Sequence, residues 1–214
     1  PILVGGTGQY VWAVVEGWGI PEVAPQPALR AALEKLGEAE LGRWLAALDP
    51  TTAGRIDPRN VRRVIRALEV TLVTGRPISQ LQRKKPPPYD IHILGLLRDR
   101  GSLYERIDQR VDTMMADGLT DELLRLREAG YGPDLPPMSG LGYRQLQPYL
   151  DGELSLDATI ERIKFETHRF ARQQATWFRP DDPRIFWFNA ETAFETVVES
   201  VTRWLARQPA DDAC

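Results

Sequence analysis

The sequence has one cysteine, Cys214, and only two histidines. A single cysteine excludes an internal disulfide framework and a thiolate metal cluster, and it favours a reducing cytoplasm as the setting. His92 and His168 are too few and too far apart to indicate a zinc site. Long apolar runs are also missing. No stretch approaches the roughly 20 residues that span a bilayer, and no signal peptide is recognisable at the start, so we expect no membrane partner.

A strong charge of one sign is absent as well. The 27 Lys and Arg residues face 30 Asp and Glu residues, which gives a net charge of −3. Overall charge therefore does not predict a nucleic-acid-binding protein, and any such role must depend on local basic surfaces. With 214 residues and 43% hydrophobic content, the chain can bury a full core, as one large domain or as one domain with an insertion.

Strand and helix patterns alternate near both ends of the chain and enclose a helical stretch. We predict strands over residues 1–4, 91–97 and 185–188, and helices over residues 9–16, 28–36, 41–48, 60–74, 103–116, 121–129, 157–178 and 193–207. Ser102 and Glu105 suggest a capping box for the helix at 103–116, and residues 130–142 suggest a long irregular loop. Alternating strands and helices favour an α/β fold with a parallel sheet covered on both faces. We expect residues 1–23 to belong to this core, 24–81 to form an all-helical insertion, and 82–214 to complete the core and add C-terminal helices.

The first ten residues, PILVGGTGQY, place a glycine-rich turn directly after an apolar run. Glycines at 5, 6 and 8 let the backbone bend sharply and approach a ligand closely. The turn lacks the GK[ST] ending of a phosphate-binding loop and does not match the dinucleotide fingerprint. By itself it is either a tight connection between strand and helix or part of a ligand site.

Arginines gather on one side of the helix predicted at 60–74. An apolar stripe contains Val61, Val64, Ile65, Leu68 and Leu72, and the opposite side carries Arg59, Arg62, Arg63 and Arg66. Two interpretations remain open. The arginines form either a solvated face steadied by Glu69 or a surface that binds phosphate backbones.

The segment SLYERIDQRVDTMM places a cation among apolar residues. Leu103, Ile107 and Met114 mark the expected buried stripe; Arg110 falls within it, and Arg106 lies at its margin. Because an unpaired buried cation costs several kcal/mol, Arg110 needs a partner. That partner is either a carboxylate in a buried ion pair or a diphosphate held by the planar guanidinium.

A second arginine row lies on the helix predicted at 157–178. Apolar residues follow one side, while the other side carries Phe165 with Arg162, Arg169, Arg172 and Arg179. Arginines interleaved with an aromatic ring suit RNA, since guanidinium groups pair with phosphates or stack on bases. An ordinary amphipathic helix would show the same pattern.

Taken in order, the motifs ILVGGTGQY, RIDPRNVRRVIRALEV, TGRPISQL, LYERIDQRVDTMMADGL, GLGYRQLQPYL and ARQQATWFR make the chain resemble the tRNA dimethylallyltransferases. The resemblance implies a P-loop-NTPase-like α/β core, of a kind that binds nucleotides such as ATP, with a helical insertion that grips the tRNA anticodon arm. It also implies transfer of a dimethylallyl group from dimethylallyl diphosphate to N6 of the adenosine beside the anticodon. The adenosine is flipped out, its N6 attacks C1 of the prenyl group, and diphosphate leaves.

The resemblance assigns roles to residues. Arg110 occupies the position of an arginine that binds the diphosphate, and Mg²⁺ is expected to help, with ligands that are not identifiable in this chain. The tRNA contacts implied for this sequence are Thr7, Arg30, Arg62, Arg63, Arg66, Ser139, Gly140, Leu141, Gly142, Tyr143, Arg144, Arg172, Gln173, Gln174, Thr176, Trp177 and Arg179. Gln173 stands where a basic residue is common, and Ser139-Gly140 replaces bulkier or basic residues, so some contacts differ from the family pattern.

Family members carry a Walker-type loop and a general-base Asp ahead of the GGTG strand, and neither is present in this sequence. We therefore expect the 214 residues to be a C-terminal portion that is inactive by itself, and the complete protein to be a monomer. Two alternatives remain. A prenyltransferase acting on free adenine nucleotides would have less need of the arginine-bearing insertion, and a non-catalytic fragment would bind RNA and do nothing else.

Overall fold

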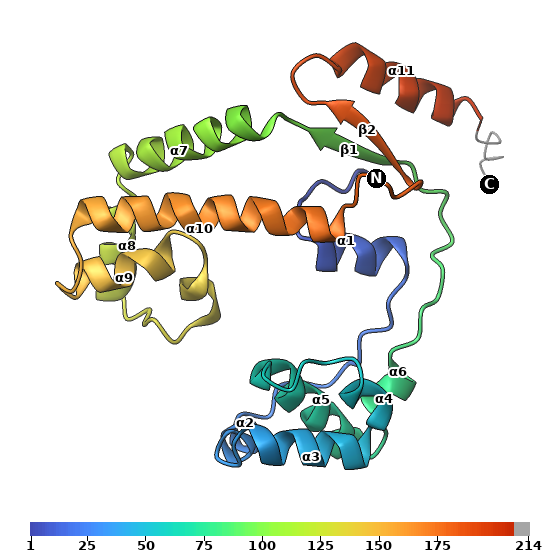
Figure 1. The fold of residues 1–214 in the computed structure, drawn as a ribbon, viewed down its shortest axis with the longest axis vertical. Coiled ribbons are helices and arrows are strands. Elements are labelled where there is room, and N and C mark those ends of the chain that lie inside the picture. The colour runs from blue at the N-terminus through green and yellow to red at the C-terminus, as the bar shows by residue number, and fades with distance from the viewer. Residues whose placement is uncertain (208–214) are drawn as a thin grey trace. The chain divides into compact units, whose positions relative to one another are not determined.

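The computed structural model describes residues 1–207 (Figure 1). The chain divides into two compact units, Pro1–Asp90 and Ile91–Cys214, and each is described by itself. No helix within residues 1–207 has the length and apolar content needed to cross a membrane. The assignment of residues 1–23 to the α/β core stays a prediction, since these residues fall in the same unit as the helical stretch that follows them.

The first unit opens with residues that belong to no strand, so the strand predicted at 1–4 is wrong for the described chain. Ile2 and Val4 are 93% and 88% exposed. A strand is defined by hydrogen bonds to a neighbour, and no segment of residues 1–207 pairs with this one. Helix α1 (Gly8–Val15) follows, and the carbonyl of Thr7 accepts from the N–H groups of Tyr10 and Val11 at 3.0 and 3.2 Å.

Two connecting segments of the first unit run antiparallel to each other on either side of the helical stretch. Trp18 pairs with Lys84, and the N–H of Lys85 donates to the carbonyl of Gly17 at 2.8 Å. Gly17 has φ +59°, and a Cβ there would lie 1.6 Å from the carbonyl oxygen of Lys85. Only glycine fits this position, because a side chain would meet backbone and would strain the left-handed conformation.

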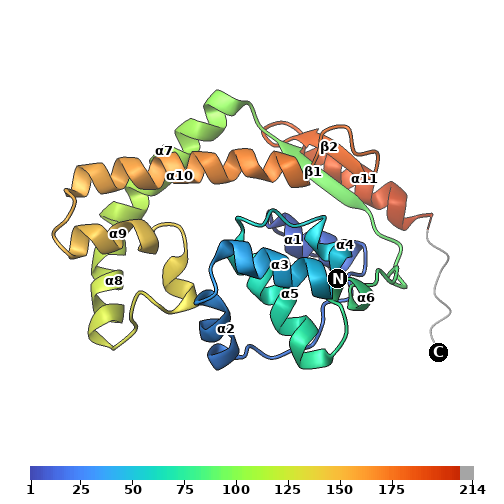
Figure 2. The same ribbon diagram turned by 60° about the horizontal axis from the view of Figure 1, so that its bottom comes forward.

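Between these segments lies a cluster of helices: α2 (Pro27–Glu34), α3 (Glu38–Leu48), α4 (Pro50–Ala53), α5 (Val61–Thr74) and α6 (Ile78–Leu81) (Figure 2). Helix α5 packs against both α2 and α3 and buries Val64, Leu68 and Val70 together with Leu41 and Leu45. The three longer helices confirm the sequence-based prediction. Helices α4 and α6 were not predicted, since four residues are too few to show a periodicity.

A buried carboxylate joins the two short helices. Asp49 accepts from the N–H and hydroxyl of Thr52 at 3.0 and 2.7 Å, and from the N–H and hydroxyl of Ser79 at 2.9 and 2.8 Å. Burial alone would raise the pKa of Asp49, but these four hydrogen bonds outweigh it and lower the pKa. Asp49 thereby fixes the start of α4 beside α6.

The second unit contains two parallel strands, β1 (Ile93–Leu97) and β2 (Ile185–Asn189), as the sequence predicted. Gly95 lies opposite Trp187, whose ring occupies the space that a Cβ at position 95 would need. Leu96 and Phe186 are 64% and 51% exposed. Within residues 1–207, therefore, helices do not cover both faces of this sheet as expected. Helix α11 (Phe194–Leu205) follows β2.

Five further elements complete the second unit: α7 (Arg100–Ala116), α8 (Leu119–Glu128), the short 3₁₀ helix η1 (Pro136–Ser139), α9 (Tyr143–Leu150) and α10 (Leu156–Trp177). Their core contains Val111, Leu123, Met138, Leu146 and Ile163. Helices α7 and α10 lie side by side (Figures 1 and 2). Element η1 interrupts the loop predicted at 130–142. Helix α9 was not predicted, because a proline inside a segment, here Pro148, argues against a helix.

The predicted capping box at Ser102 and Glu105 is wrong. Helix α7 begins at Arg100, and the Asp99 carboxylate accepts from the N–H groups of Gly101 and Ser102 at 2.9 and 3.1 Å. The Ser102 hydroxyl instead donates to Glu191 at 3.1 Å. A carboxylate one turn earlier is a stronger acceptor for the free N–H groups at a helix start, so it sets the boundary.

Candidate functional site

A buried carboxylate organises the arginines of the helical cluster. Glu69 on α5 has no exposed side-chain surface. Nε and Nη2 of Arg30 on α2 donate to its two oxygens at 2.8 and 2.7 Å, and Nη1 of Arg66 donates at 2.6 Å. The N–H of Gln26 adds a fourth bond at 2.7 Å. The hydrogen bond from Arg30 is the main reason that the pKa of Glu69 falls to about 2, with further lowering by Gln26 and Arg66.

This arrangement corrects the expectation of a solvated arginine face steadied by Glu69. Arg66 and Arg30 turn toward a buried partner, and Arg66 also donates to the carbonyl of Val23 at 3.0 Å. Arg62 and Arg63 are exposed and form no ion pair within residues 1–207. They are the arginines of α5 whose charge is available to an incoming phosphate.

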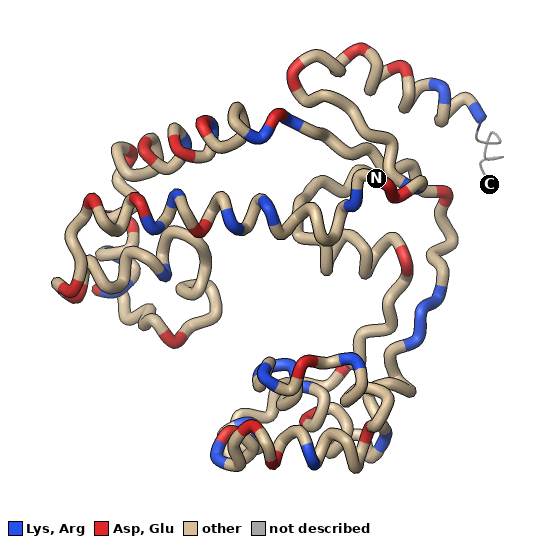
Figure 3. Tube along the Cα trace, viewed as in Figure 1, with Lys and Arg blue, Asp and Glu red and all other residues tan. Residues whose placement is uncertain are grey.

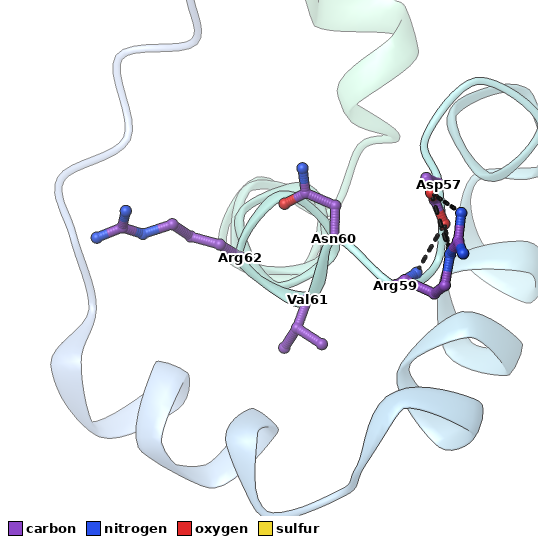
Figure 4. Close-up of a pocket in the computed structure, with 5 residues that line it drawn as sticks. All are labelled: Asp57, Arg59, Asn60, Val61 and Arg62. Atoms are coloured by element: carbon purple, nitrogen blue, oxygen red, sulfur yellow. Dashed lines mark hydrogen bonds and ion pairs between the residues drawn. The ribbon is translucent and has the colours of Figure 1, made fainter. Parts of the chain in front are cut away.

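A shallow depression lies at the N-terminal end of α5. It is lined by Asp57, Arg59, Asn60, Val61 and Arg62 (Figure 4). Arg59 turns back onto the Asp57 carboxylate, with Nη2 to Oδ2 at 2.8 Å, whereas Arg62 extends from another side of the helix. Arg59 is therefore partly neutralised, and the four arginines named from the sequence do not form one free surface.

Arg110 lies on the exposed side of α7, which corrects its predicted place in the buried stripe. Its neighbour Val111 is the residue that α7 buries, and Leu103, Ile107 and Met114 are half-buried. The buried stripe is narrower than the sequence suggests, so its margin at Arg110 reaches solvent. Within residues 1–207 Arg110 has no carboxylate partner, so the buried ion pair is not formed in this part of the chain.

Three polar pairs join α7 to α10, and successive pairs are four residues apart on each helix. Nη1 of Arg172 donates to Oη of Tyr104 at 3.0 Å, Nε2 of His168 lies 2.9 Å from Oδ1 of Asp108, and Nζ of Lys164 lies 2.8 Å from Oδ1 of Asp112. The hydrogen bond from Arg172, with a second from Arg100, lowers the pKa of Tyr104. The Asp112 carboxylate raises the pKa of Lys164. These pairs fix the antiparallel register of the two helices.

The arginine row predicted on α10 is exposed as expected. Basic residues recur along this helix (Figure 3), and its exposed arginines are Arg162, Arg169 and Arg172. Arg179, also exposed, lies two residues beyond its end. Phe165 lies on the same side of the helix as its arginines and is 59% exposed. Phe170 and Trp177, on another side, are 41% and 38% exposed. Exposed rings and guanidinium groups on one helix can stack on bases and contact phosphates.

The segment from Ser139 to Arg144 approaches α10 through its last residue, Arg144. Nη2 of Arg144 lies 3.8 Å from Glu166, and Nη1 of Arg169 lies 3.9 Å from the same carboxylate oxygen. Gly142 has φ +95° and donates its N–H to the Gln145 side chain at 3.0 Å, which starts α9. Ser139, Gly140 and Leu141 are exposed, whereas Gly142 is buried. The structure thus brings Arg144 together with the α10 row.

The remaining predicted contact residues lie at three helix ends. Thr7 is exposed at the start of α1. At the C-terminal end of α10, Gln173, Thr176 and Trp177 are exposed, Gln174 is half-buried, and the Thr176 hydroxyl donates to the carbonyl of Gln173 at 2.7 Å. Tyr143 hydrogen-bonds Glu122 of α8 through its hydroxyl.

Sequence reasoning missed the partners that orient these residues. Tyr104 and Arg100 converge with the predicted contact Arg172, yet neither was singled out for such a role. Glu69 was expected to steady a solvated arginine face, and its burial was not foreseen. The spacing of Arg100 and Tyr104 on one helix face was visible, but their shared partner on α10 was not.

The described residues offer no evident metal site. Within residues 1–207 there is no group of three or more His, Cys, Asp or Glu side chains placed to hold a metal ion.

Comparison with known proteins places these features in context. Residues 1–181 match the family model described as IPP transferase. The chain is 54% identical over 183 residues to the tRNA dimethylallyltransferase of Roseiflexus sp. strain RS-1, covering 84% of this chain and 60% of that protein. It is 48% identical over 207 residues to the tRNA dimethylallyltransferase of Dehalococcoides mccartyi, covering 95% and 64%. The chain thus spans about three fifths of the length of these relatives.

Solved structures of transferases that act on tRNA also resemble this chain. The full-length tRNA isopentenylpyrophosphate transferase of Bacillus halodurans is 34% identical, with a TM-score of 0.60 over 96% of this chain and 65% of that one. A eukaryotic dimethylallyltransferase captured acting on tRNA has a TM-score of 0.76 over 98% of this chain and 57% of that one, and at 23% identity it shares the fold. From the family match over most of its length and the identity to these relatives, the chain belongs to the IPP transferase family.

Proposed function

We propose that the complete protein transfers a dimethylallyl group from dimethylallyl diphosphate to N6 of the adenosine beside the anticodon of tRNA. The relatives named above are tRNA dimethylallyltransferases, and this chain shares about half of its residues with them. The observation that carries the proposal is the side of α10 on which the exposed Phe165 lies with the exposed Arg162, Arg169 and Arg172. Such a surface suits a single-stranded RNA loop whose bases are unstacked.

The proposed contacts fall on both units. In the helical cluster, Arg62 and Arg63 carry the free charge that would meet phosphates, while Arg30 and Arg66 are held by Glu69. In the second unit, the α10 row and Arg144 would contact the anticodon arm, with Thr7 of the first unit beside the entering nucleotide. The target adenosine would have to leave its stack for its N6 to reach the prenyl group.

Arg110 is proposed to neutralise the departing diphosphate. As N6 attacks C1 of the prenyl group, negative charge builds on the diphosphate oxygens, and a guanidinium group placed there stabilises that charge. An exposed side chain with no carboxylate partner among residues 1–207 is free to do this. We propose that Mg²⁺ also binds the diphosphate; its protein ligands are not identifiable in this chain.

Two other functions compete with this one. Transfer to a free adenine nucleotide would use the same chemistry, but the exposed Arg62 and Arg63 on α5 favour a larger polyanion. RNA binding without catalysis remains the proposal for the 214 residues alone, since the sequence contains no GxxxxGK[ST] loop to hold a diphosphate.

A transfer assay separates these functions. The complete protein is supplied with radiolabelled dimethylallyl diphosphate and, in parallel, with tRNA, with the same tRNA carrying guanosine beside the anticodon, and with adenosine monophosphate. We expect label in the first acceptor only. Label in adenosine monophosphate would overturn the tRNA assignment, and label in no acceptor would leave RNA binding as the function.

A further inference from the structure

Two arginines from different helices of the second unit meet at one phenolic oxygen. Nε of Arg100, the first residue of α7, donates to Oη of Tyr104 at 3.1 Å, and Nη1 of Arg172 on α10 donates to the same oxygen at 3.0 Å. The guanidinium carbon of Arg100 also lies 5.3 Å from the centroid of the Tyr104 ring. The neutral Tyr104 hydroxyl thus accepts hydrogen bonds from two positively charged side chains.

Among the described residues, no carboxylate neutralises these two guanidinium groups. Within residues 1–207 neither Arg100 nor Arg172 forms an ion pair, in contrast to Arg30 and Arg66, which share Glu69. Like charges around one atom repel each other, so the pair favours an anion. Both side chains are exposed, and planar guanidinium forks match the geometry of phosphate oxygens.

The ring of Tyr104 is packed against a neighbouring side chain. It stacks on His168, with centroids 4.1 Å apart and planes at 10°. The stacking restricts rotation of the Tyr104 ring. The hydrogen bonds to its hydroxyl then restrict the side chains of Arg100 and Arg172 as well. A site whose donors are held before the ligand arrives loses less conformational entropy on binding.

We propose that Arg100 and Arg172 form a two-guanidinium site for one phosphate group, and that Tyr104 is a positioning residue that holds both side chains ready. Arg172 already belongs to the proposed RNA contacts; Arg100 and Tyr104 extend them. The phosphate is carried by the RNA backbone or by a diphosphate, and in the first case the site rests on the proposed function. The binding chemistry is the same for both sources.

The first test measures how salt weakens RNA binding. The complete protein and its Arg100→Ala/Arg172→Ala variant are titrated with a labelled tRNA anticodon stem-loop at several salt concentrations, and with inorganic diphosphate in a calorimeter. Each phosphate neutralised contributes about 0.7 to 0.9 to the slope of log K against log salt. We expect the variant to lose about one such increment, because the two arginines share one phosphate.

The possible outcomes are distinct. A loss of two increments would mean two separate phosphates and would overturn the shared site. An unchanged slope with weakened diphosphate binding would assign the phosphate to the small molecule, whereas no change in either titration would overturn the site. If the unmodified protein binds no RNA, the proposed function fails, and the diphosphate titration still tests the site.

A matched control removes one arginine elsewhere. Arg125 on α8 is exposed and has no ion pair within residues 1–207. Arg125→Ala should leave the salt slope and diphosphate binding unchanged. A loss equal to that of the double variant would mean that general charge, and not a built site, is responsible.

The role of Tyr104 is tested by Tyr104→Phe, which keeps the ring stacked on His168 and removes the acceptor oxygen. We expect about a threefold or larger loss of affinity for the phosphate ligand, with an unchanged thermal midpoint. In the Arg100→Ala/Arg172→Ala background, the same substitution should cause no further loss, since its effect acts through the arginines. An equal loss in both backgrounds would overturn the positioning role.

Discussion

Nη2 of Arg30 lies 2.7 Å from Oε2 of Glu69, a carboxylate without exposed surface that is 39 residues away in the sequence. The pair joins α2 to the centre of the helical cluster, and Arg66 completes it. A residue expected to balance charge on the surface is thus the buried anchor of two arginines. The distinction between anchored and free arginines can be tested directly.

Replacing Glu69 with Gln should destabilise the helical cluster. The substitution leaves two arginines facing a neutral amide, and breaking a buried ion pair typically costs about 3 to 5 kcal/mol. We expect a loss toward the lower end, because the side chains of Arg30 and Arg66 are 38% and 35% exposed and can regain water. Urea unfolding measures it, with Glu34→Gln on the exposed side of α2 as the control. Equal stability of the two variants would contradict the anchor role.

The same carboxylate predicts how stability depends on pH. The pKa of Glu69 is lowered from 4.5 to about 2 in the folded protein. A depressed folded pKa means that the stabilisation is fully present above about 4.5 and is lost as pH falls toward about 2. Urea midpoints measured across this window should converge for the protein and its Glu69→Gln variant. A constant difference down to pH 2 would show that Glu69 is not the titrating group.

Arg62→Ala/Arg63→Ala should weaken RNA binding without weakening the fold. Both side chains are exposed and unpaired within residues 1–207, so their removal takes away charge and leaves the core intact. We expect the salt slope to fall by about 0.7 to 0.9 for each phosphate lost. The comparison is Arg30→Ala/Arg66→Ala, which removes the same formal charge but should lower the urea midpoint. If both pairs changed stability and the salt slope equally, the division between free and anchored arginines would be wrong.

Arg110→Gln in the complete protein should reduce turnover much more than tRNA affinity. A lost charge-stabilising donor typically costs about 10²-fold or more in rate. Because Arg110 is exposed and has no carboxylate partner among residues 1–207, the thermal midpoint should stay unchanged. Single-turnover transfer and equilibrium tRNA binding are measured together. A parallel loss of stability and binding would indicate a structural role instead.

Gly17→Ala should destabilise the first unit. The new Cβ would lie 1.6 Å from the carbonyl oxygen of Lys85, at a φ of +59° that alanine rarely adopts. The antiparallel contact between the two connecting segments would have to open. Gly5→Ala is the control, since a Cβ there meets nothing within 4 Å. Thermal unfolding with equal midpoints for both variants would contradict the close packing at Gly17.

Much of the fold was predictable because it depends on local patterns. The apolar spacing on α5 and α10 predicted both helices to within one or two residues, and the same 3.6-residue period predicted that the α10 arginines face solvent. The strands predicted at 91–97 and 185–188 match β1 and β2 to within two residues, and their separation by helices indicated the parallel pairing that β1 and β2 adopt. Periodicity reports which side of an element is buried.

Periodicity does not report what an element packs against, and only the tertiary structure decided that. Glu69 follows the arginines of α5 by a few residues and reads as a surface charge, but Arg30 and Gln26 approach it from α2 and make its burial possible. Arg110 reads as buried because it falls within the expected apolar stripe, yet α7 buries Val111 and leaves Arg110 in solvent. Tyr104 and Arg172 meet across 68 residues. Charge burial and convergence depend on through-space partners, and sequence spacing carries no information on those distances.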